Sequence, residues 1–333
     1  MAMSPQTSRE LRYDDPKLTS ADVISVVVPA YNEEESLQPL YEELSEALGK
    51  LGLQYEIIFV NDGSTDGTHP AALRICNADS HVKCIRLRRN FGKAEALDAG
   101  FKEAKGTIIF TMDADLQDDP AEIPNFLAKL EEGYDLVSGW KFHRLDPIGK
   151  TLPSKLFNMV ASATTGVKLH DFNCGFKAYR REVLEHLNVY GELHRYIPAL
   201  ANGNGFAVGE IKVHHRQRKF GKTKYGMARF TRGLLDLLTV LFITRYTKKP
   251  LHLFGSLGLA LLGMGVVING YLAVLWFMGY AIGHRPLLTL GVLLMILGIQ
   301  SISTGLLGEM IVHVQHKDDH CVASKTHNDG KTE

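Results

Sequence analysis

Two aspartates separated by a single residue are the first feature of this sequence that could do chemistry. Asp113-Ala114-Asp115 follows the apolar run 107–112, and Gln117 stands two positions further on. If an extended strand continues through these positions, residues i and i+2 point the same way, so the two carboxylates and the Gln117 amide face one point. Two carboxylates repel unless a cation joins them, and such oxygen ligands suit Mg²⁺ or Mn²⁺, which also bind substrate phosphates. The spacing therefore predicts a divalent metal site at Asp113, Asp115 and Gln117, although a solvated loop can carry the same pattern.

A second polar segment begins where another apolar run ends. Asp62 follows the β-rich run 55–61 and precedes the turn-rich stretch Gly63-Ser64-Thr65-Asp66-Gly67. An exposed Asp62 carboxylate would accept a hydrogen bond from the imide of a nucleobase or from a ribose hydroxyl. The same stretch also fits a tight connection from strand to helix, with Asp66 or Thr68 as the cap. Both interpretations can hold together.

A third segment places a cation at a predicted helix start. Arg89-Asn90-Phe91-Gly92-Lys93 leads into the helical pattern 93–104. The backbone N–H groups of a helix N-terminus attract anions, and the charge of Lys93 adds to that attraction. We therefore expect this segment to meet a diphosphate.

Alternating strands and helices must position these segments. Strands are predicted at 23–29, 55–61, 82–87 and 107–112, and helices at 35–51, 70–77 and 93–104. This alternation is typical of an α/β protein with a mostly parallel sheet. Ligands of such sheets bind beyond the carboxyl ends of the strands, where Tyr31-Asn32-Glu33 would join the segments above. A later strand is expected at 172–179.

Charge and cysteine content exclude some classes of function. The 333 residues include 37 basic and 37 acidic side chains, so the net charge is zero. We therefore expect no nucleic-acid partner, because such partners favour a strongly basic surface. The four cysteines form no C-x-x-C pair, which favours incidental thiols in a reducing compartment over a disulfide framework or a metal site.

Two apolar segments near the C-terminus predict a membrane hairpin. Neither 253–282 nor 286–308 contains Asp, Glu, Lys or Arg, and about 20 apolar residues suffice to span a bilayer. The spans are expected at about 252–281 and 286–312, joined by a short turn. Buried core helices are the alternative, but both runs are longer than such helices usually are.

The charges beside the hairpin predict its orientation. Arg245, Lys248, Lys249 and Lys317 outnumber Arg285 in the turn, so the positive-inside rule places both ends of the hairpin in the cytoplasm. Residues 1–21 are polar and lack the apolar core of a signal peptide. We therefore expect a multi-pass protein of the inner (plasma) membrane, with its α/β part and both termini in the cytoplasm.

One segment between the α/β part and the hairpin has an amphipathic pattern. Phe230, Leu234 and Leu237 share one helical face while Arg232 and Asp236 share the other, as in a helix that lies in the membrane interface. A helix packed on the protein core is the alternative. The predicted parts are a polar tail at 1–21, the α/β domain at 22–226, the interfacial helix and linker at 227–249, the hairpin at 250–314 and a disordered cytoplasmic tail at 315–333.

Three ordered motifs resemble one enzyme family. Val28-Pro29-Ala30-Tyr31-Asn32-Glu33, Asn61-Asp62-Gly63-Ser64-Thr65-Asp66 and Met112-Asp113-Ala114-Asp115-Leu116-Gln117-Asp118 are similar to motifs of the family-two glycosyltransferases with the GT-A fold. Within that family, the polyprenyl-phosphate sugar synthases are most similar, namely the dolichyl-phosphate mannose synthases and the bactoprenol glucosyltransferases. The likeness extends from about Val23 to the second apolar span. It implies a divalent-metal-dependent hexosyltransferase that uses a nucleotide diphosphate sugar and a polyprenyl phosphate such as undecaprenyl or dolichyl phosphate.

The resemblance also implies roles for individual residues. The nucleoside is held by Pro29, Tyr31, Glu33 and Asp62, the metal by Asp113, Asp115 and Gln117, and the diphosphate by Arg218 and Lys224 in Arg218-Lys219-Phe220-Gly221-Lys222-Thr223-Lys224. With Lys93 and Ala114 these residues complete the predicted nucleotide-sugar site.

The lipid phosphate is expected at a basic segment. The resemblance implies Lys141, Lys150 and Ser154 as its ligands, with Arg144 supplying the bidentate geometry that the two lysines lack. A solvated basic loop near anionic lipid headgroups is the alternative interpretation of these residues.

The predicted chemistry stabilises a leaving diphosphate. A metal at Asp113 and Asp115, together with Arg218, Lys224 and Lys93, would hold the charge that develops there. A phosphate monoester is largely dianionic at pH 7, so no strong base is needed. This agrees with Gly191-Glu192-Leu193-His194-Arg195, where related enzymes that glycosylate hydroxyl groups carry an acidic pair. Asp171 is a catalytic candidate that would orient the sugar or the acceptor, with a turn-capping role as the alternative.

Other functions fit the sequence less well. A processive polysaccharide synthase would carry a Gln-x-x-Arg-Trp motif, which this chain lacks. A membrane scaffold with a degenerate nucleotide-binding domain would not need the intact Asp113, Asp115 and Gln117, and a lipid acceptor without phosphate, such as a diacylglycerol, would not need the basic segment.

The resemblance of the two-span tail to the bacterial enzymes favours UDP-glucose as donor and a homo-oligomer, such as a tetramer. The product would serve surface glycan or glycoconjugate assembly.

Overall fold

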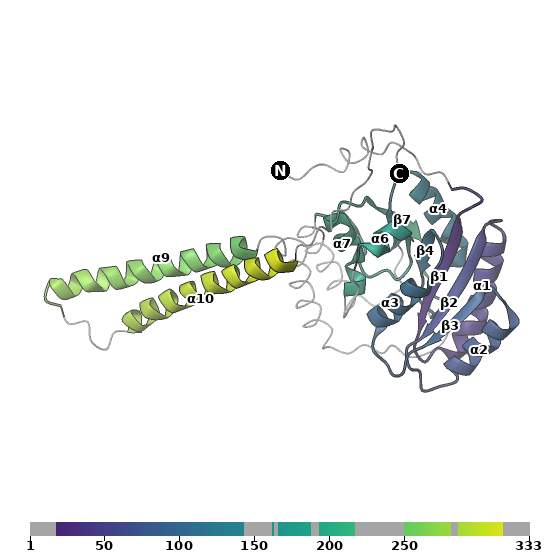
Figure 1. The fold of residues 1–333 in the computed structure, drawn as a ribbon, viewed down its shortest axis with the longest axis horizontal. Helices are drawn as coiled ribbons and strands as arrows, with labels where there is room; N and C mark the ends of the chain where they lie inside the picture. The colour runs from purple at the N-terminus through teal and green to yellow at the C-terminus, as the bar shows by residue number, and fades with distance from the viewer. Residues whose placement is uncertain are drawn as a thin grey trace. The chain divides into compact units, whose positions relative to one another are not determined.

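The structure of this chain is a computed structural model, drawn in Figure 1. It describes residues 18–142, 162, 166–187, 193–216, 250–280 and 286–315. The chain separates into two compact units, Met1–Val240 and Leu241–Glu333. The predicted interfacial helix at 227–249 lies outside the described residues, as do the predicted tails apart from 18–21 and 315.

A seven-stranded sheet forms the centre of the first unit, in the order β3-β2-β1-β4-β6-β5-β7. The strands are β1 (Val23–Ala30), β2 (Gln54–Asn61), β3 (Val82–Arg86), β4 (Ile108–Thr111), β5 (Leu136–Lys141), β6 (Lys177–Arg180) and β7 (Val208–Val213). β6 is antiparallel to both of its neighbours, β4 and β5, whereas the other pairs are parallel. The prediction of a mostly parallel α/β sheet is therefore confirmed.

Helices cover both faces of this sheet (Figure 1). The longer ones are α1 (Glu34–Gly49), α2 (Thr68–Ala78), α3 (Lys93–Glu103) and α4 (Ile123–Glu131); shorter ones are η2 (Pro120–Glu122), α6 (Arg181–Glu185), η3 (Leu193–Arg195) and α7 (Ile197–Gly203). Alternate residues of β1 point to opposite faces: Val26 and Val28 pack with α1, whereas Val27 packs with α3.

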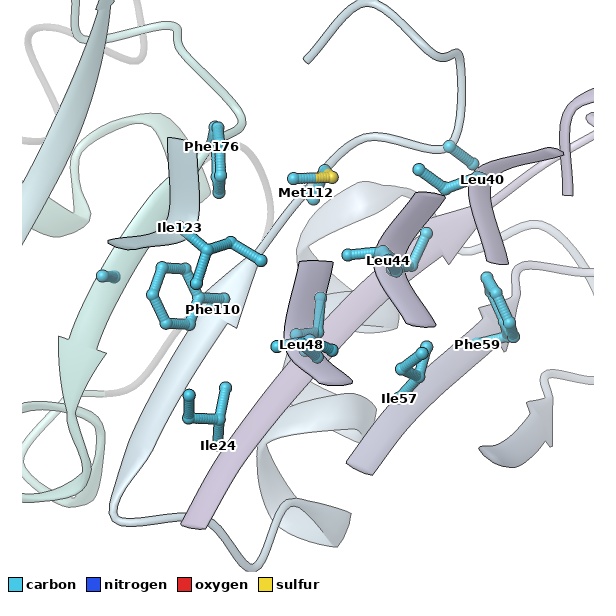
Figure 2. Close-up of a cluster of buried hydrophobic side chains, with 14 of the residues drawn as sticks. Ile24, Leu40, Leu44, Leu48, Ile57, Phe59, Phe110, Met112, Ile123 and Phe176 are labelled. Carbon is cyan, nitrogen blue, oxygen red and sulfur yellow. The ribbon is translucent and has the colours of Figure 1, made fainter. Parts of the chain in front are cut away.

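The core between the sheet and α1 fixes the position of the strand ends. Leu40, Leu44 and Leu48 of α1 lie over β1 and β2, as Figure 2 shows, and all three are fully buried. Phe110 of β4 contacts Phe126 of α4 edge-on, with ring centroids 5.8 Å apart. Each such side chain contributes roughly 1.5–3 kcal/mol when it is buried, so the sheet is a rigid support for the loops that follow its strands.

The predicted elements agree with the observed ones within a few residues, except at one strand. The strand expected at 172–179 begins only at Lys177. The carbonyl of Cys174 accepts a hydrogen bond from the Lys177 Nζ, and the carbonyl of Gly175 accepts one from the Thr111 hydroxyl at 2.8 Å. These two carbonyls are thus bonded to side chains, and the backbone before Lys177 turns instead of extending.

The second unit is a pair of apolar helices, α9 (Pro250–Phe277) and α10 (Pro286–Gln315). Each is long and apolar enough to cross a bilayer, with a mean hydropathy of 2.0. The predicted hairpin is therefore present, with its first span ending four residues earlier than expected. Glycines let the two helices approach closely: a Cβ on Gly258 would lie 2.6 Å from the carbonyl oxygen of Gly298.

We expect Gly258→Leu to destabilise this hairpin. The added side chain would clash with the Gly298 carbonyl and with Ile302, whose Cγ1 would lie 2.6 Å from the new Cβ. Small residues at such interfaces permit close backbone packing, and overpacking costs about 1–3 kcal/mol. Thermal unfolding of the full chain in detergent would measure the loss. Gly263→Leu is the matched control, since no atom lies within 4 Å of its Cβ position, and an equal loss in both variants would contradict the packing explanation.

Candidate active site

The loops that follow β1 and β2 are joined by hydrogen bonds. The backbone N–H of Asn32 donates to the Ser64 hydroxyl at 3.0 Å, and the N–H of Thr65 donates to the Asn32 side-chain oxygen at 2.9 Å. Asn32 has a φ of 54°, a left-handed conformation that non-glycine residues adopt rarely and that often marks functional sites. The predicted nucleoside residues Tyr31 and Glu33 flank it and are thereby fixed at the carboxyl edge of the sheet.

The Asp62 carboxylate holds the loop before α3. One oxygen accepts the N–H of Phe91 at 2.8 Å and the other accepts the N–H of Gly92 at 2.9 Å. Asp62 is 4% exposed, so the expectation of an exposed carboxylate was wrong. Burial raises the pKa of Asp62, against the opposing effect of the two N–H donors. The alternative, a tight connection from strand to helix, agrees with the structure, since Asp66 accepts the N–H of Thr68 at the start of α2.

Asp62→Asn is expected to destabilise the protein by about 1–3 kcal/mol, because an amide can accept only one of the two N–H groups and the other stays buried without a partner. The displaced 89–93 loop should also weaken binding of uridine diphosphate. Chemical denaturation and titration calorimetry measure the two effects. Asp98→Asn, on the exposed side of α3 where Asp98 pairs with Lys102, is the control. Unchanged nucleotide affinity in Asp62→Asn would limit Asp62 to a folding role.

The segment Asp113-Ala114-Asp115 forms a turn instead of a strand end. β4 ends at Thr111, Ala114 and Asp115 lie in a turn, and Leu116 has a φ of 60°. The expected alternation of side chains therefore does not apply beyond Thr111. The turn therefore positions the Asp115 carboxylate. The left-handed backbone conformation of Leu116 is of a type found at functional sites.

Lys93 and Asp113 form an ion pair between the start of α3 and the end of β4. Burial disfavours the charged form of Asp113, but Lys93, Lys141 and Lys177 outweigh it and keep the pKa of Asp113 below its usual range. Lys93 was expected to meet a diphosphate, and its Nζ is held beside the carboxylate predicted to bind the metal. A metal-bound diphosphate at Asp113 would lie within reach of Lys93.

Gln117 is directed towards the end of β7. Its amide nitrogen lies 3.4 Å from Nε2 of His215 and 3.5 Å from the carbonyl oxygen of Arg216. Arg216 also pairs with Glu43 at 2.6 Å and with Asp119 at 2.7 Å. The segment after the two aspartates is therefore tied both to α1 and to the residues that lead into the predicted diphosphate residue Arg218.

Lys141, expected at the lipid phosphate, contacts a buried carboxylate. Its Nζ lies 3.2 Å from Asp118 Oδ1, and the Lys141 side chain is 13% exposed. Burial disfavours the charge, but Asp118, Asp113 and Asp115 outweigh it and raise the pKa of Lys141. The alternative of a solvated basic loop is thus wrong for Lys141. Arg144, Lys150, Ser154, Arg218 and Lys224 lie outside the described residues.

Asp171 makes the contact of a turn cap. Its Oδ1 accepts the N–H of Asn173 at 3.0 Å, and its own N–H donates to Glu210. The residue is buried. This geometry agrees with the turn-capping role that was the alternative interpretation of Asp171. A role of Asp171 in orienting the sugar or the acceptor stays a prediction.

The sequence did not identify the residues beneath Asp113. A Cβ on Gly175 would lie 2.5–2.7 Å from the three carboxyl atoms of Asp113, so only glycine leaves room for that carboxylate. Lys177 is 3% exposed, and burial lowers its pKa to about 8. A lysine inside the apolar run 174–179 was the signal that could have indicated a buried cation.

A pocket opens beside these residues. Lys93, Thr111, Asn173, Lys177, His194 and Arg195 are among the ten residues that line it. Burial and the neighbouring cations Lys93, Arg195 and Lys177 lower the pKa of His194 well below its usual range. His194 is therefore neutral at pH 7.

The donor atoms of the site suit a divalent cation. Asp113 and Asp115 offer carboxylate oxygens and Gln117 an amide oxygen, the ligand type that Mg²⁺ and Mn²⁺ prefer. The described residues contain no cluster of three or more His, Cys, Asp or Glu side chains that could hold a metal by itself. An ion at Asp113 and Asp115 would thus complete its shell with other oxygen atoms, as Mg²⁺ does with substrate phosphates and water.

Most of this chain is similar in sequence to known proteins. The model of glycosyl transferase family 2 matches residues 25–187. A dodecaprenyl-phosphate galacturonate synthase of Rhizobium johnstonii is 41% identical, covering 89% of each chain. An undecaprenyl-phosphate 4-deoxy-4-formamido-L-arabinose transferase of Shewanella sediminis is 38% identical, covering 87% of each chain.

Solved structures show the same fold. The complex of Mycobacterium tuberculosis glucosyl-3-phosphoglycerate synthase with Mn²⁺, uridine diphosphate and glucosyl-3-phosphoglycerate has a TM-score of 0.53 and 21% identity, over 70% of this chain and 86% of that one. The resemblance drawn from the three motifs and the expected GT-A fold are both confirmed. The chain belongs to glycosyltransferase family 2 and, within it, to the polyprenyl-phosphate sugar transferases.

Proposed function

We propose that this chain transfers a sugar from a nucleotide diphosphate sugar to the phosphate of a polyprenyl phosphate, with inversion at the anomeric carbon. The observation that carries the proposal is the meeting of three loops at one edge of the sheet, in a chain whose relatives are named for this reaction. These loops bring Asp62, Lys93 and Asp113 together through the contacts of Asp62 with Phe91 and Gly92 and of Lys93 with Asp113.

The proposed roles follow from the chemistry of each group. Pro29, Tyr31 and Glu33 hold the nucleoside, Asp62 positions the adjoining loop through Phe91 and Gly92, and Asp113, Asp115 and Gln117 hold Mg²⁺ or Mn²⁺. The bound ion supplies Lewis acidity to the leaving diphosphate. Lys93 stabilises the same negative charge from the start of α3, with Arg218 and Lys224 as its predicted partners.

The proposed acceptor needs no strong base. A phosphate monoester is largely dianionic at neutral pH, and its oxygen can attack the anomeric carbon directly while the bond from that carbon to the diphosphate oxygen breaks. His194 has a depressed pKa and is neutral, which fits an acceptor that arrives without its proton. The predicted ligands of this phosphate are Lys141, Arg144, Lys150 and Ser154; Lys141 would have to exchange Asp118 for the phosphate.

The hairpin supports a location at a membrane. α9 and α10 are each long enough to span a bilayer, which would keep the enzyme beside a lipid acceptor. We propose the inner membrane, with the first unit on the cytoplasmic side where nucleotide sugars are made, and a homo-oligomer as the assembled form. The donor favoured by the sequence was UDP-glucose, whereas the two relatives above are named for galacturonate and for a formamido-arabinose.

Release of nucleoside diphosphate by the purified full chain tests this function. The reaction mixture would contain Mg²⁺ or Mn²⁺, a panel of UDP- and GDP-sugars and a short polyprenyl phosphate. Release that requires the lipid phosphate and stops with a chelator is the expected result. Equal release with a polyprenol that lacks the phosphate would reject the acceptor, and no release with any donor would reject the proposed function.

A further inference from the structure

The pocket beside Asp113 has an excess of positive charge. Lys93, Lys177 and Arg195 line it, and the described residues of its lining include no Asp or Glu. Asp113, which pairs with Lys93, and Asp171 are anions that act on these cations from outside the lining. Lys177 is almost completely buried and its Nζ donates to the Cys174 carbonyl, but an ammonium group has three donors. A buried charge with unfilled donors is costly unless an anion approaches it.

Two residues that line this pocket each have a buried polar atom without a hydrogen-bond partner. These atoms are His194 Nδ1 and Asn173 Oδ1. A neutral imidazole can donate from Nδ1, and an amide oxygen accepts. Most buried polar groups in proteins are paired, so an unpaired donor and acceptor in one pocket call for an explanation. A ligand that carries an anionic group and a hydroxyl could accept a hydrogen bond from His194 Nδ1 and donate one to Asn173 Oδ1.

The position of the pocket indicates which part of a substrate would enter it. Thr111 and Gly175 line it, and Gly175 also touches the Asp113 carboxylate. The proposed metal and diphosphate therefore lie next to the pocket. The diphosphate carries the nucleoside at one end and the donor sugar at the other. Since the nucleoside is proposed at the loops that follow β1 and β2, the sugar is the part of the donor that can reach Lys177 and His194.

We propose that this pocket binds the carboxylate of a uronic acid, so that the donor is a nucleotide diphosphate hexuronate instead of a neutral hexose. The proposal rests on the proposed function, because it names the donor class of the same site. Lys177 pairs with the carboxylate, His194 Nδ1 donates to it, and Asn173 accepts from a neighbouring sugar hydroxyl. A neutral sugar would leave the two remaining donors of the Lys177 ammonium group without a charged partner inside the pocket.

Matched pairs of donors test this assignment. UDP-galacturonate and UDP-galactose differ only at C6, as do UDP-glucuronate and UDP-glucose. The full chain in detergent, with undecaprenyl phosphate and Mn²⁺, should show a kcat/KM about 10- to 100-fold higher for the uronate of the preferred pair, the range of a charge-assisted hydrogen bond. A ratio near one, or a preference for the neutral sugar, overturns the inference while leaving the proposed function intact.

Binding without acceptor provides an independent measurement. Calorimetry with UDP-galacturonate and UDP-galactose should show tighter binding of the uronate, and equal affinities would overturn the inference even if no turnover occurs. Absence of transfer from any donor, by contrast, rejects the proposed function itself.

Lys177→Met links the preference to the pocket, because methionine is unbranched and nearly as long as lysine but carries no charge. We expect the ratio of uronate to neutral donor to fall towards one, with Lys177→Arg retaining most of it and the exposed Lys102→Met leaving it unchanged. The ratio is measured within one protein sample, so partial unfolding does not alter it. An equal loss for both donors would assign Lys177 to the diphosphate, and a raised KM for undecaprenyl phosphate alone would assign it to the acceptor; either result overturns the inference.

Discussion

Asp115→Asn is expected to lower sugar transfer by on the order of 100- to 1,000-fold, the usual effect of removing one group that stabilises transition-state charge. Asparagine has nearly the same shape as aspartate but lacks the negative charge that strengthens the binding of a divalent cation. The N–H of Gln117 can still donate to the side-chain oxygen at this position, as it does to Asp115 at 3.2 Å, so the turn should persist. The loss should therefore appear in kcat/KM and not in the unfolding midpoint.

Metal titration separates the metal role from other roles of Asp115. The variant should need a higher Mn²⁺ concentration for half-maximal activity, because one carboxylate ligand is lost. Asp98→Asn, which changes an exposed aspartate of α3, is the matched control and should behave as the wild type. Full activity of Asp115→Asn at unchanged metal concentration would exclude Asp115 from the metal site.

Gly175→Ala is expected to reduce activity by about 100-fold or more, comparable to the loss of a group at the reacting centre. The alanine Cβ would lie 2.5 Å from one carboxyl oxygen of Asp113, which is well inside contact distance. The carboxylate must therefore move, and a displacement of about 1 Å in an active site can cost 100-fold. The change adds one methyl group at a residue that carries no charge and has no catalytic side chain.

Two comparisons make this prediction specific. Gly49→Ala, at the end of α1 where no atom lies within 4 Å of the Cβ position, should leave activity unchanged. In an Asp113→Asn background, Gly175→Ala should add little further loss, because both changes act on the same carboxylate. Additive losses in the double variant would show that Gly175 acts independently of Asp113.

Much of the site could be predicted because its chemistry is local in the sequence. Asp113 and Asp115 are separated by one residue, and the Gly92 and Lys93 pair stands directly at a helix start. The polar residues at strand ends were expected to converge, since the strands are parallel and share one carboxyl edge. Lys93 was expected to meet a diphosphate, and its ion pair with Asp113 was not predicted.

Other features of the site depend on contacts between distant residues. The sequence could not reveal that Asp62 is buried, because its two donors, Phe91 and Gly92, are 29 and 30 residues away. The contact between Gly175 and Asp113 joins positions in different elements, and the pairing of Lys141 with Asp118 depends on how the end of β5 packs beside the turn after β4. Sequence spacing carries no information about such packing.

The sequence by itself determined the order of strands and helices from β1 to β4, the apolar hairpin and the types of residue at the strand ends, whereas β5, β7, α6 and α7 were not predicted. The predicted features follow from periodicity, from segment length and from side-chain chemistry, all of which are local properties. The tertiary structure alone decided that β6 begins only at Lys177, which carboxylates are buried and which cations surround the pocket at His194. Those properties arise because the folding chain brings distant backbone carbonyls and charges together, where burial and pairing compete for each polar group.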